Sequence, residues 1–207
     1  MRIDLRLANE SEWLKVFDPR DSTLAAVTKS SPAVGTQVRV DLVIGKEGPR
    51  VILHGQVISH QSDGCTVAIS PGDREKINYV NGFVRGGLLN LRERRRLPVR
   101  LEVTYGGLEG PCKTFTRDIN EEGVFILTDA PLPEDSEVHL FLSAPGNATP
   151  LSLTGMVQHT VVPDDEDTPG MGIMFKLEDG QRATLTKLVD DLEKAFLSGQ
   201  LPEALLL

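Results

Sequence analysis

The sequence is short of several features that mark common protein classes. Its 207 residues include only two cysteines, Cys65 and Cys112, which lack the spacing of a metal site. We expect two free thiols in a reducing compartment, although one disulfide is the alternative. No apolar run approaches the ~20 residues of a membrane span, and the N-terminus has no apolar signal core. We therefore expect a cytoplasmic protein without membrane insertion.

Positive charge and catalytic motifs are also scarce. The formal net charge is -8, which argues against binding to a nucleic-acid polymer, because such a partner needs a broad basic surface. No Ser-His-Asp or Cys-His arrangement, paired-carboxylate motif or glycine-rich phosphate loop is visible, and the four histidines have no ligand spacing. We therefore expect neither an enzyme nor a bound metal or cofactor.

Aromatic residues are few, at 5%, whereas the chain has 19 glycines and 13 prolines. This balance favours short strands and turns over long helices. Three segments of the first half recur 100 residues later in one register: residues 23–28 with 123–128, residues 38–42 with 138–142, and residues 53–57 with 153–157. In the last pair three of five residues are identical, and the second pair has the alternation of half-buried strands. We interpret the chain as two copies of one β-unit.

An amphipathic helix is predicted after the second copy. Its apolar residues fall on one face at helical spacing, with Gly199 as a stop: Leu185, Leu188, Val189, Leu192 and Phe196. Such a stripe can pack on its own domain or serve a homodimer, and both stay open. The fold class is therefore mainly β, with two small antiparallel β-barrels in tandem, the second followed by a C-terminal α-helix.

The boundary between the two copies should fall between residues 81 and 90. There, Asn81-Gly82 and Gly86-Gly87 predict flexible or tightly turned backbone. We accordingly expect two domains, residues 1–88 and residues 89–207.

Positive charge is concentrated at this boundary. Six arginines and one acid, Glu93, lie between Arg85 and Arg100, a local charge of +5 in an acidic chain. Arginines repel one another unless an anion or carboxylates offset their charge, and the planar guanidinium matches phosphate oxygens at two points. By itself such a run is typical of a solvated face or a nonspecific polyanion patch.

A second motif downstream makes the signal more specific. Arg92-x-x-x-Arg96 is followed, 22 residues after Arg96, by Asp118-x-Asn120-x-x-Gly123. This pair resembles the signature of the PilZ family, an R-x-x-x-R segment leading into the first strand and (D/N)-x-S-x-x-G on the next. Residues 97–105 look like the family's first strand, and a terminal helix is also expected there.

The resemblance covers residues 90 to 197, and the first copy, roughly 23 to 70, looks like the same barrel without the ligand motif. It implies a non-enzymatic receptor for cyclic di-GMP, a bacterial second messenger with two phosphates and two guanines. The ligand-binding residues that it implies are Arg92, Arg95, Arg96, Asp118, Asn120 and Gly123. We expect the ligand to bind at the junction of the barrels, to change their arrangement, and so to regulate an unidentified protein partner.

The chemistry of these residues fits that ligand. Arg92 and Arg96 can hold phosphate oxygens or the guanine O6/N7 edge, and Arg95 can add a phosphate or stacking contact. Asp118 can accept from guanine N–H groups, and Gly123 lets the backbone approach closely.

Three questions stay open at the level of sequence. Arg100 is also spaced correctly from Arg96, but it would lie inside the strand, so we prefer Arg92 with Arg96. We treat the same spacing of Arg2 and Arg6 as coincidence. Asn120 stands where the family usually has serine, so the alternative function is a PilZ-like protein-interaction module that has lost cyclic di-GMP binding.

Overall fold

The computed structural model describes residues 1–28, 32–45, 50–89, 95–163 and 167–206. The chain divides into two compact units, which we call the first unit (Met1–Arg95 with Lys194–Gln200) and the second unit (Arg96–Glu193 with Leu201–Leu207). The division into domains of residues 1–88 and 89–207 stays a prediction.

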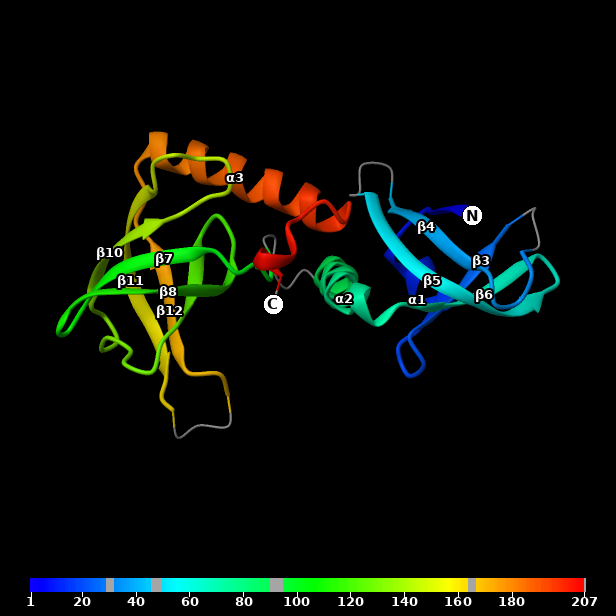
Figure 1. Ribbon diagram of the computed structural model, residues 1–207, viewed down its shortest axis with the longest axis horizontal. Coiled ribbons are helices and arrows are strands. Elements are labelled where there is room, and N and C mark those ends of the chain that lie inside the picture. Colours follow the sequence, from blue (N-terminus) through cyan, green and yellow to red (C-terminus); the bar gives the residue numbers. More distant parts are fainter. Residues whose placement is uncertain (29–31, 46–49, 90–94, 164–166, 207) are drawn as a thin grey trace. The chain divides into compact units, whose positions relative to one another are not determined.

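The first unit contains an open six-stranded sheet in the order β1-β4-β5-β6-β3-β2 (Figure 1). Its strands are β1 (Arg2–Leu7), β2 (Phe17–Asp18), β3 (Thr23–Val27), β4 (Gln37–Ile44), β5 (Arg50–Gln61) and β6 (Gly64–Ile69). Buried and exposed side chains alternate along β1, so one face of that strand lies in the core. Strand β1 runs parallel to β4, whereas the other pairs in this sheet are antiparallel.

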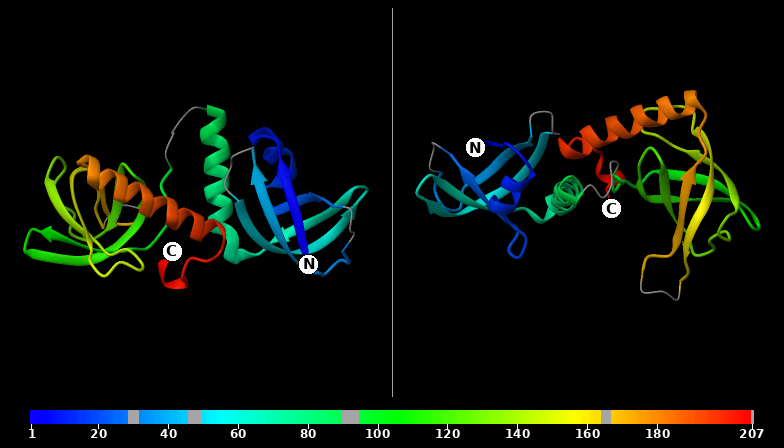
Figure 2. Two further views of the ribbon diagram at one scale, coloured as in Figure 1. Left: turned by 90° about the horizontal axis from the view of Figure 1, so that it is seen from above. Right: turned by 180° about the vertical axis from the view of Figure 1, so that it is seen from behind.

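Two helices pack in the first unit, α1 (Glu10–Val16) and α2 (Arg74–Leu89), the latter preceded by a 3-10 turn at Pro71–Asp73. Figure 2 shows α2 standing beside the sheet of this unit. Trp13 of α1 is fully buried and donates its indole N–H to Asn81 Oδ1 of α2 at 2.8 Å. The two helices are thereby joined by both apolar packing and a hydrogen bond.

The prediction of flexible or turned backbone at Asn81-Gly82 and Gly86-Gly87 is wrong, because both pairs lie inside α2. A glycine in a helix costs about 1 kcal/mol relative to alanine. Helix α2 also buries an apolar stripe of Ile77, Val80 and Val84. Burial of such side chains stabilises by roughly 1.5–3 kcal/mol each, which outweighs the glycine cost.

The second unit is a closed barrel in the order β10-β11-β12-β9-β8-β7 (Figure 1). Its strands are β7 (Glu102–Gly107), β8 (Gly110–Ile119), β9 (Gly123–Leu127), β10 (Glu137–Leu142), β11 (Leu151–Val161) and β12 (Gly170–Phe175). All of its strand pairs are antiparallel. The prediction of a mainly β fold with a barrel in the second half is thus confirmed, while the sheet of the first unit is a half-barrel.

The predicted C-terminal helix is confirmed as α3 (Asp179–Leu197). Leu185, Val189 and Leu192 are buried, as is Phe196 near its end. Gly199 has a φ of 70°, the left-handed conformation that ends helices. A last 3-10 turn spans Glu203–Leu205.

The strand pairing agrees with the predicted repeat over residues 38–57 and 138–157. Val38 faces Gly55 across β4 and β5, and Val138 faces Gly155 across β10 and β11. In the next strand pairs the register shifts at matching places, at Val57/Ser59 between β5 and β6 and at Val157/His159 between β11 and β12. The two units therefore share pairing as well as sequence at an offset of 100 residues.

The first strand of the second half begins later than the sequence predicts. In place of one strand over residues 97–105, β7 begins at Glu102 and Leu97 forms only an isolated bridge. Pro98 has no backbone N–H with which to continue a ladder. The hydroxyl of Thr116 bridges the gap, donating to the Val99 carbonyl at 2.5 Å and accepting from the Leu101 N–H at 2.9 Å.

Both cysteines are free thiols, Cys65 buried and Cys112 half-buried, and burial raises the pKa of Cys65. Among the helices of the described ranges, none combines the length and apolar character that crossing a membrane requires.

Candidate functional site

Three of the predicted site residues lie at the connection of β8 to β9: Asp118 near the end of β8, Asn120 in the turn and Gly123 at the start of β9. Asn120 Oδ1 accepts from the backbone N–H groups of Glu122 at 3.0 Å and Gly123 at 2.8 Å, and the Asn120 N–H donates to the Gly123 carbonyl at 2.9 Å. Asn120 is 5% exposed. Its side-chain oxygen therefore shapes the turn, a task that a serine hydroxyl can also perform.

Gly123 allows a close approach of backbone. A Cβ at this position would lie 2.4 Å from the Ile173 carbonyl oxygen on β12 and 3.4 Å from Arg96 Nη2. The first distance is too short for any side chain, so β9 and β12 can pair here only with glycine. The second distance shows that the Arg96 guanidinium lies against this same stretch of backbone.

Arg96 and Asp118 form an ion pair, with 3.0 Å between Nη1 and Oδ1. The next residue, Leu97, holds Arg96 in place, because its N–H and carbonyl exchange hydrogen bonds with Ile119 at 2.7 and 3.0 Å. The side chains of Arg96 and Asp118 are 32% and 16% exposed. The structure thus brings Arg96, Asp118 and Gly123 together at one edge of the barrel, with both charged groups still open to solvent.

Arg117 is a residue that the sequence motifs did not indicate. Its Nε donates to Asp118 Oδ2 at 2.9 Å, and its guanidinium carbon lies 3.6 Å from the centre of the Phe125 ring. Asp118 is therefore bracketed by Arg96 on one oxygen and Arg117 on the other. The one signal in the sequence that could have indicated Arg117 is its position directly before Asp118. It was missed because Arg117 lies outside the arginine run at residues 85–100.

The other two predicted arginines lie elsewhere. Arg92 lies outside the described residues. Arg95 belongs to the first unit, where its guanidinium carbon lies 4.1 Å from the Phe83 ring centre and 5.5 Å from that of Tyr79. Arg95 is therefore in contact with two aromatic rings of α2.

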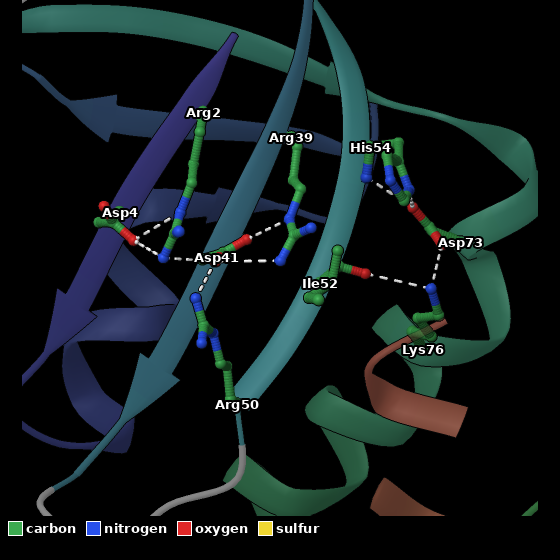
Figure 3. Close-up of polar contacts among 9 residues, drawn as sticks. All are labelled: Arg2, Asp4, Arg39, Asp41, Arg50, Ile52, His54, Asp73 and Lys76. Atoms are coloured by element: carbon green, nitrogen blue, oxygen red, sulfur yellow. Dashed lines mark hydrogen bonds and ion pairs between the residues drawn. The ribbon is translucent and has the colours of Figure 1, made fainter. Parts of the chain in front are cut away.

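In the first unit a second group of arginines surrounds Asp41 (Figure 3). The sequence did not indicate this group. Arg2 lies 2.8 Å and Arg39 2.6 Å from the Asp41 carboxylate, and Arg50 also pairs with it. Arg2 pairs with Asp4 as well. Burial acts to raise the pKa of Asp41, but hydrogen bonds from Arg39 and Arg50 outweigh it and hold the pKa below its usual value. Arg2 thus has a structural partner within its own sheet.

Asp73 forms a smaller cluster beside these strands (Figure 3). It accepts from Lys76 Nζ at 2.6 Å and from the His54 N–H at 2.6 Å, and Lys76 also donates to the Ile52 carbonyl at 3.1 Å. These bonds tie the start of α2 to β5. Within the described ranges no three His, Cys, Asp or Glu side chains are grouped to hold a metal ion.

Comparison with known proteins gives one family match. The model of the PilZ domain matches residues 90–191. No curated protein sequence shows significant similarity to the chain.

Solved structures show looser likenesses. The Bacillus subtilis inhibitor of motility MotI/DgrA is 14% identical, with 84% of this chain and 79% of that chain covered and a TM-score of 0.42. The K. pneumonia MrkH–c-di-GMP complex is 12% identical, with coverages of 83% and 77% and a TM-score of 0.40. YcgR from Escherichia coli in complex with c-di-GMP is 11% identical, with coverages of 70% and 61% and a TM-score of 0.41. None of the three superimposes closely, so the match over residues 90–191 is the finding that bears on function.

Proposed function

Residues 90–191 belong to the PilZ domain family, and we propose that this protein is a non-enzymatic receptor for cyclic di-GMP. The observation that supports this most directly is the Arg96–Asp118 ion pair beside the close backbone approach at Gly123. Arg96 and Asp118, one from each motif, are separated by 22 residues in sequence and lie 3.0 Å apart in the fold.

Each residue of this group has a task that suits the ligand. Arg96, with Arg92, offers guanidinium N–H groups in a planar fork to phosphate oxygens or to guanine O6 and N7. Asp118 accepts the N–H groups of the guanine edge. The turn held by Asn120 keeps Asp118 at the end of β8, and Gly123 leaves room for the ligand beside Arg96.

Arg95 is proposed only as a supplementary contact. Its guanidinium already packs on Phe83 and Tyr79. We therefore expect Arg95→Ala to weaken binding less than Arg96→Ala.

A small number of such contacts is sufficient for a cellular receptor. Charged or two-point hydrogen bonds contribute roughly 1 to 3 kcal/mol each. Micromolar affinity needs about 8 kcal/mol. Contacts from Arg92, Arg96 and Asp118, with Arg95 as the supplementary one, would together support binding at about micromolar concentration.

Calorimetric titration of the full chain with cyclic di-GMP tests the proposal. We expect saturable heat at tens of micromolar ligand, and loss of that heat in Arg96→Ala. Cyclic di-AMP serves as the ligand control, because adenine lacks the edge that Asp118 would recognise. Absence of heat from the unaltered chain, or unaltered binding by Arg96→Ala, would count against the receptor function.

The register of the arginine motif is tested in the same titration. Arg100 lies over the Phe115 ring at 4.1 Å, which gives it a partner away from Asp118. We therefore expect Arg92→Ala to weaken binding and Arg100→Ala to leave it unchanged. The reverse result would assign the motif to Arg96 and Arg100.

Regulation is proposed to follow from ligand binding. The ligand would change the arrangement of the two units and thereby the surface offered to an unidentified protein partner, by an amount limited to its differential affinity for the two arrangements. Small-angle scattering and sedimentation of the full chain with and without cyclic di-GMP measure that change and any homodimer. Identical curves in both conditions would remove this part of the proposal.

A further inference from the structure

Arg117 has a geometry that its ion pair with Asp118 does not explain. Its guanidinium carbon lies 3.6 Å from the Phe125 ring centre, so one planar face of the group is stacked on the ring. The side chain is nevertheless 36% exposed. One face is therefore occupied by Phe125 while part of the group stays open to solvent.

The ring beneath Arg117 is held firmly. Phe125 is fully buried, and a Cβ on Gly170 would lie 2.4 Å from Phe125 Cε1, so the ring packs directly on glycine backbone. The Arg117 Nε bond to Asp118 Oδ2, at 2.9 Å, fixes the guanidinium in the other direction. Arg117 is thus a planar cation fixed by two contacts, which lowers the entropy lost when a further group stacks on it.

The partly exposed Arg117 lies beside the carboxylate that would recognise guanine. Arg96 and Arg117 each occupy one oxygen of Asp118. A carboxylate has about four lone-pair sites, so two further N–H groups can still be accepted. A base whose N–H edge reached Asp118 would bring its ring close to the Arg117 guanidinium.

We propose that Arg117 is a further ligand-binding residue, a stacking platform on which one guanine of cyclic di-GMP lies while its edge bonds to Asp118. This inference rests on the proposed receptor function and adds a recognition element outside both motifs. Arginine planes stack on bases in the same way as aromatic rings do. The stack would be Phe125, then Arg117, then guanine.

Two substitutions at position 117 separate stacking from charge. Arg117→Lys keeps a positive charge near Asp118 but removes the planar face, and Arg117→Ala removes both. Loss of one base stack weakens affinity by about tenfold. We therefore expect both variants to bind cyclic di-GMP about tenfold more weakly than the unaltered chain.

Lys113→Ala is the matched control. Lys113 lies four residues earlier on β8, is 65% exposed and pairs with Glu102 at 2.8 Å. Its loss removes one positive charge from the same strand without touching the stack, so binding should not change. Circular dichroism melts of all variants check that the barrel is folded.

The outcomes are distinct. A tenfold loss in both Arg117 variants with an unaffected control supports the stacking platform. Binding by Arg117→Lys equal to that of the unaltered chain assigns Arg117 to charge alone and overturns the platform, while the receptor function stands. Absence of binding by the unaltered chain overturns the receptor function and the platform with it.

Discussion

The two units share strand pairing and differ in how they are completed. Leu53, Gly55 and Val57 in the first unit and Leu153, Gly155 and Val157 in the second are the identical residues of the repeat. The leucines and valines are buried, and a Cβ on either glycine would lie within 3 Å of atoms on the neighbouring strand. The residues that are identical in the two copies are therefore those whose packing leaves room for few other side chains.

The two units differ in whether the sheet closes into a barrel. In the second unit β7 pairs antiparallel with β10 and closes the barrel. In the first unit the neighbour of β4 is β1, which runs parallel to it and leaves the sheet open. The same hairpins can thus be completed by different strands, because their own pairing does not depend on what lies at the edge.

The turn that carries the proposed site also differs between the units. Asp118 is bracketed by Arg96 and Arg117, whereas Asp18 pairs with its exposed neighbour Arg20 at 2.8 Å. Thr23 occupies the place of Gly123. The two units thus differ in the ion pairs of this turn, and we propose a binding site only in the second unit, which the following experiments test.

The largest effect is expected from alanine at the repeat glycines. In Gly55→Ala the new Cβ would lie 2.3 Å from the Ala68 carbonyl oxygen, and in Gly155→Ala 2.5 Å from Ile173 Cγ2. Overpacking of this kind lowers the free energy of unfolding by about 3 kcal/mol. Trp13, the single tryptophan, lies in the first unit, so its fluorescence should report Gly55→Ala, while circular dichroism should report both variants.

Gly72→Ala and Gly106→Ala are the matched controls, one in each unit, because nothing lies within 4 Å of the added Cβ. Their unfolding should match that of the unaltered chain. A Trp13 transition lowered equally by Gly55→Ala and Gly155→Ala would mean that the two units unfold as one.

The next effect is on ligand affinity. Asp118→Asn keeps the shape of the side chain but removes its charge, and hydrogen bonds to charged groups contribute about 2 kcal/mol. We expect roughly thirtyfold weaker binding of cyclic di-GMP in a calorimetric titration. The counterpart in the other unit, Asp18→Asn, should bind normally. Equal losses in the two variants would contradict the division of roles between the units.

A smaller effect is expected at the arginine cluster of the first unit. Asp41→Asn leaves Arg2, Arg39 and Arg50 without their shared carboxylate. These arginines are 43–52% exposed, so solvent screens the lost interactions. We expect the free energy of unfolding to fall by about 1 to 2 kcal/mol, measured by urea unfolding followed by Trp13 fluorescence.

The loss of stability caused by Asp41→Asn should depend on pH with a defined sign. The pKa of Asp41 is lowered in the folded protein, so its contribution is complete above the unfolded pKa of about 3.9 and is lost as pH falls through the folded pKa. The difference in free energy of unfolding between the unaltered chain and Asp41→Asn should therefore be largest at pH 7 and shrink below about pH 4. In the second unit Glu137→Gln, which removes an exposed partner of Lys176, should change nothing measurable.

The smallest effect is expected from Asn120→Ser. Serine can accept the same turn N–H groups that Asn120 Oδ1 accepts from Glu122 and Gly123. Affinity for cyclic di-GMP should change by less than about 0.5 kcal/mol, or about twofold. Binding that is present in Asn120→Ser and absent from the unaltered chain would favour the alternative, a protein-interaction module that has lost its ligand.

Much of the fold could be predicted from the sequence, because its signals are local or repeated. Period-2 alternation at Val38 and Val138 predicted paired strands, and an apolar stripe with Gly199 predicted α3. The helix through Asn81-Gly82 could not be predicted from local preference, because burial of Val80 and Val84 against the rest of the first unit outweighs the glycines.

The candidate site likewise contains residues that the sequence predicts and one that only the structure reveals. The spacing of the two motifs is sufficient to single out Arg96, Asp118 and Gly123. It does not identify Arg117, whose proposed role depends on a ring eight residues further along the chain that β8–β9 pairing brings beneath it. Contacts across strands need the register, and the register is set by all the pairs together.

The sequence by itself therefore determined that this is a two-copy, mainly β protein with an arginine motif and a turn motif in the second copy. Only the tertiary structure decided that β1 joins the first sheet in parallel, that three arginines share Asp41, and that Arg117 lies between Asp118 and Phe125. The reason is physical: periodicity and turn chemistry act over a few residues, whereas edge pairing, buried charge and stacking depend on groups that meet only in the folded chain.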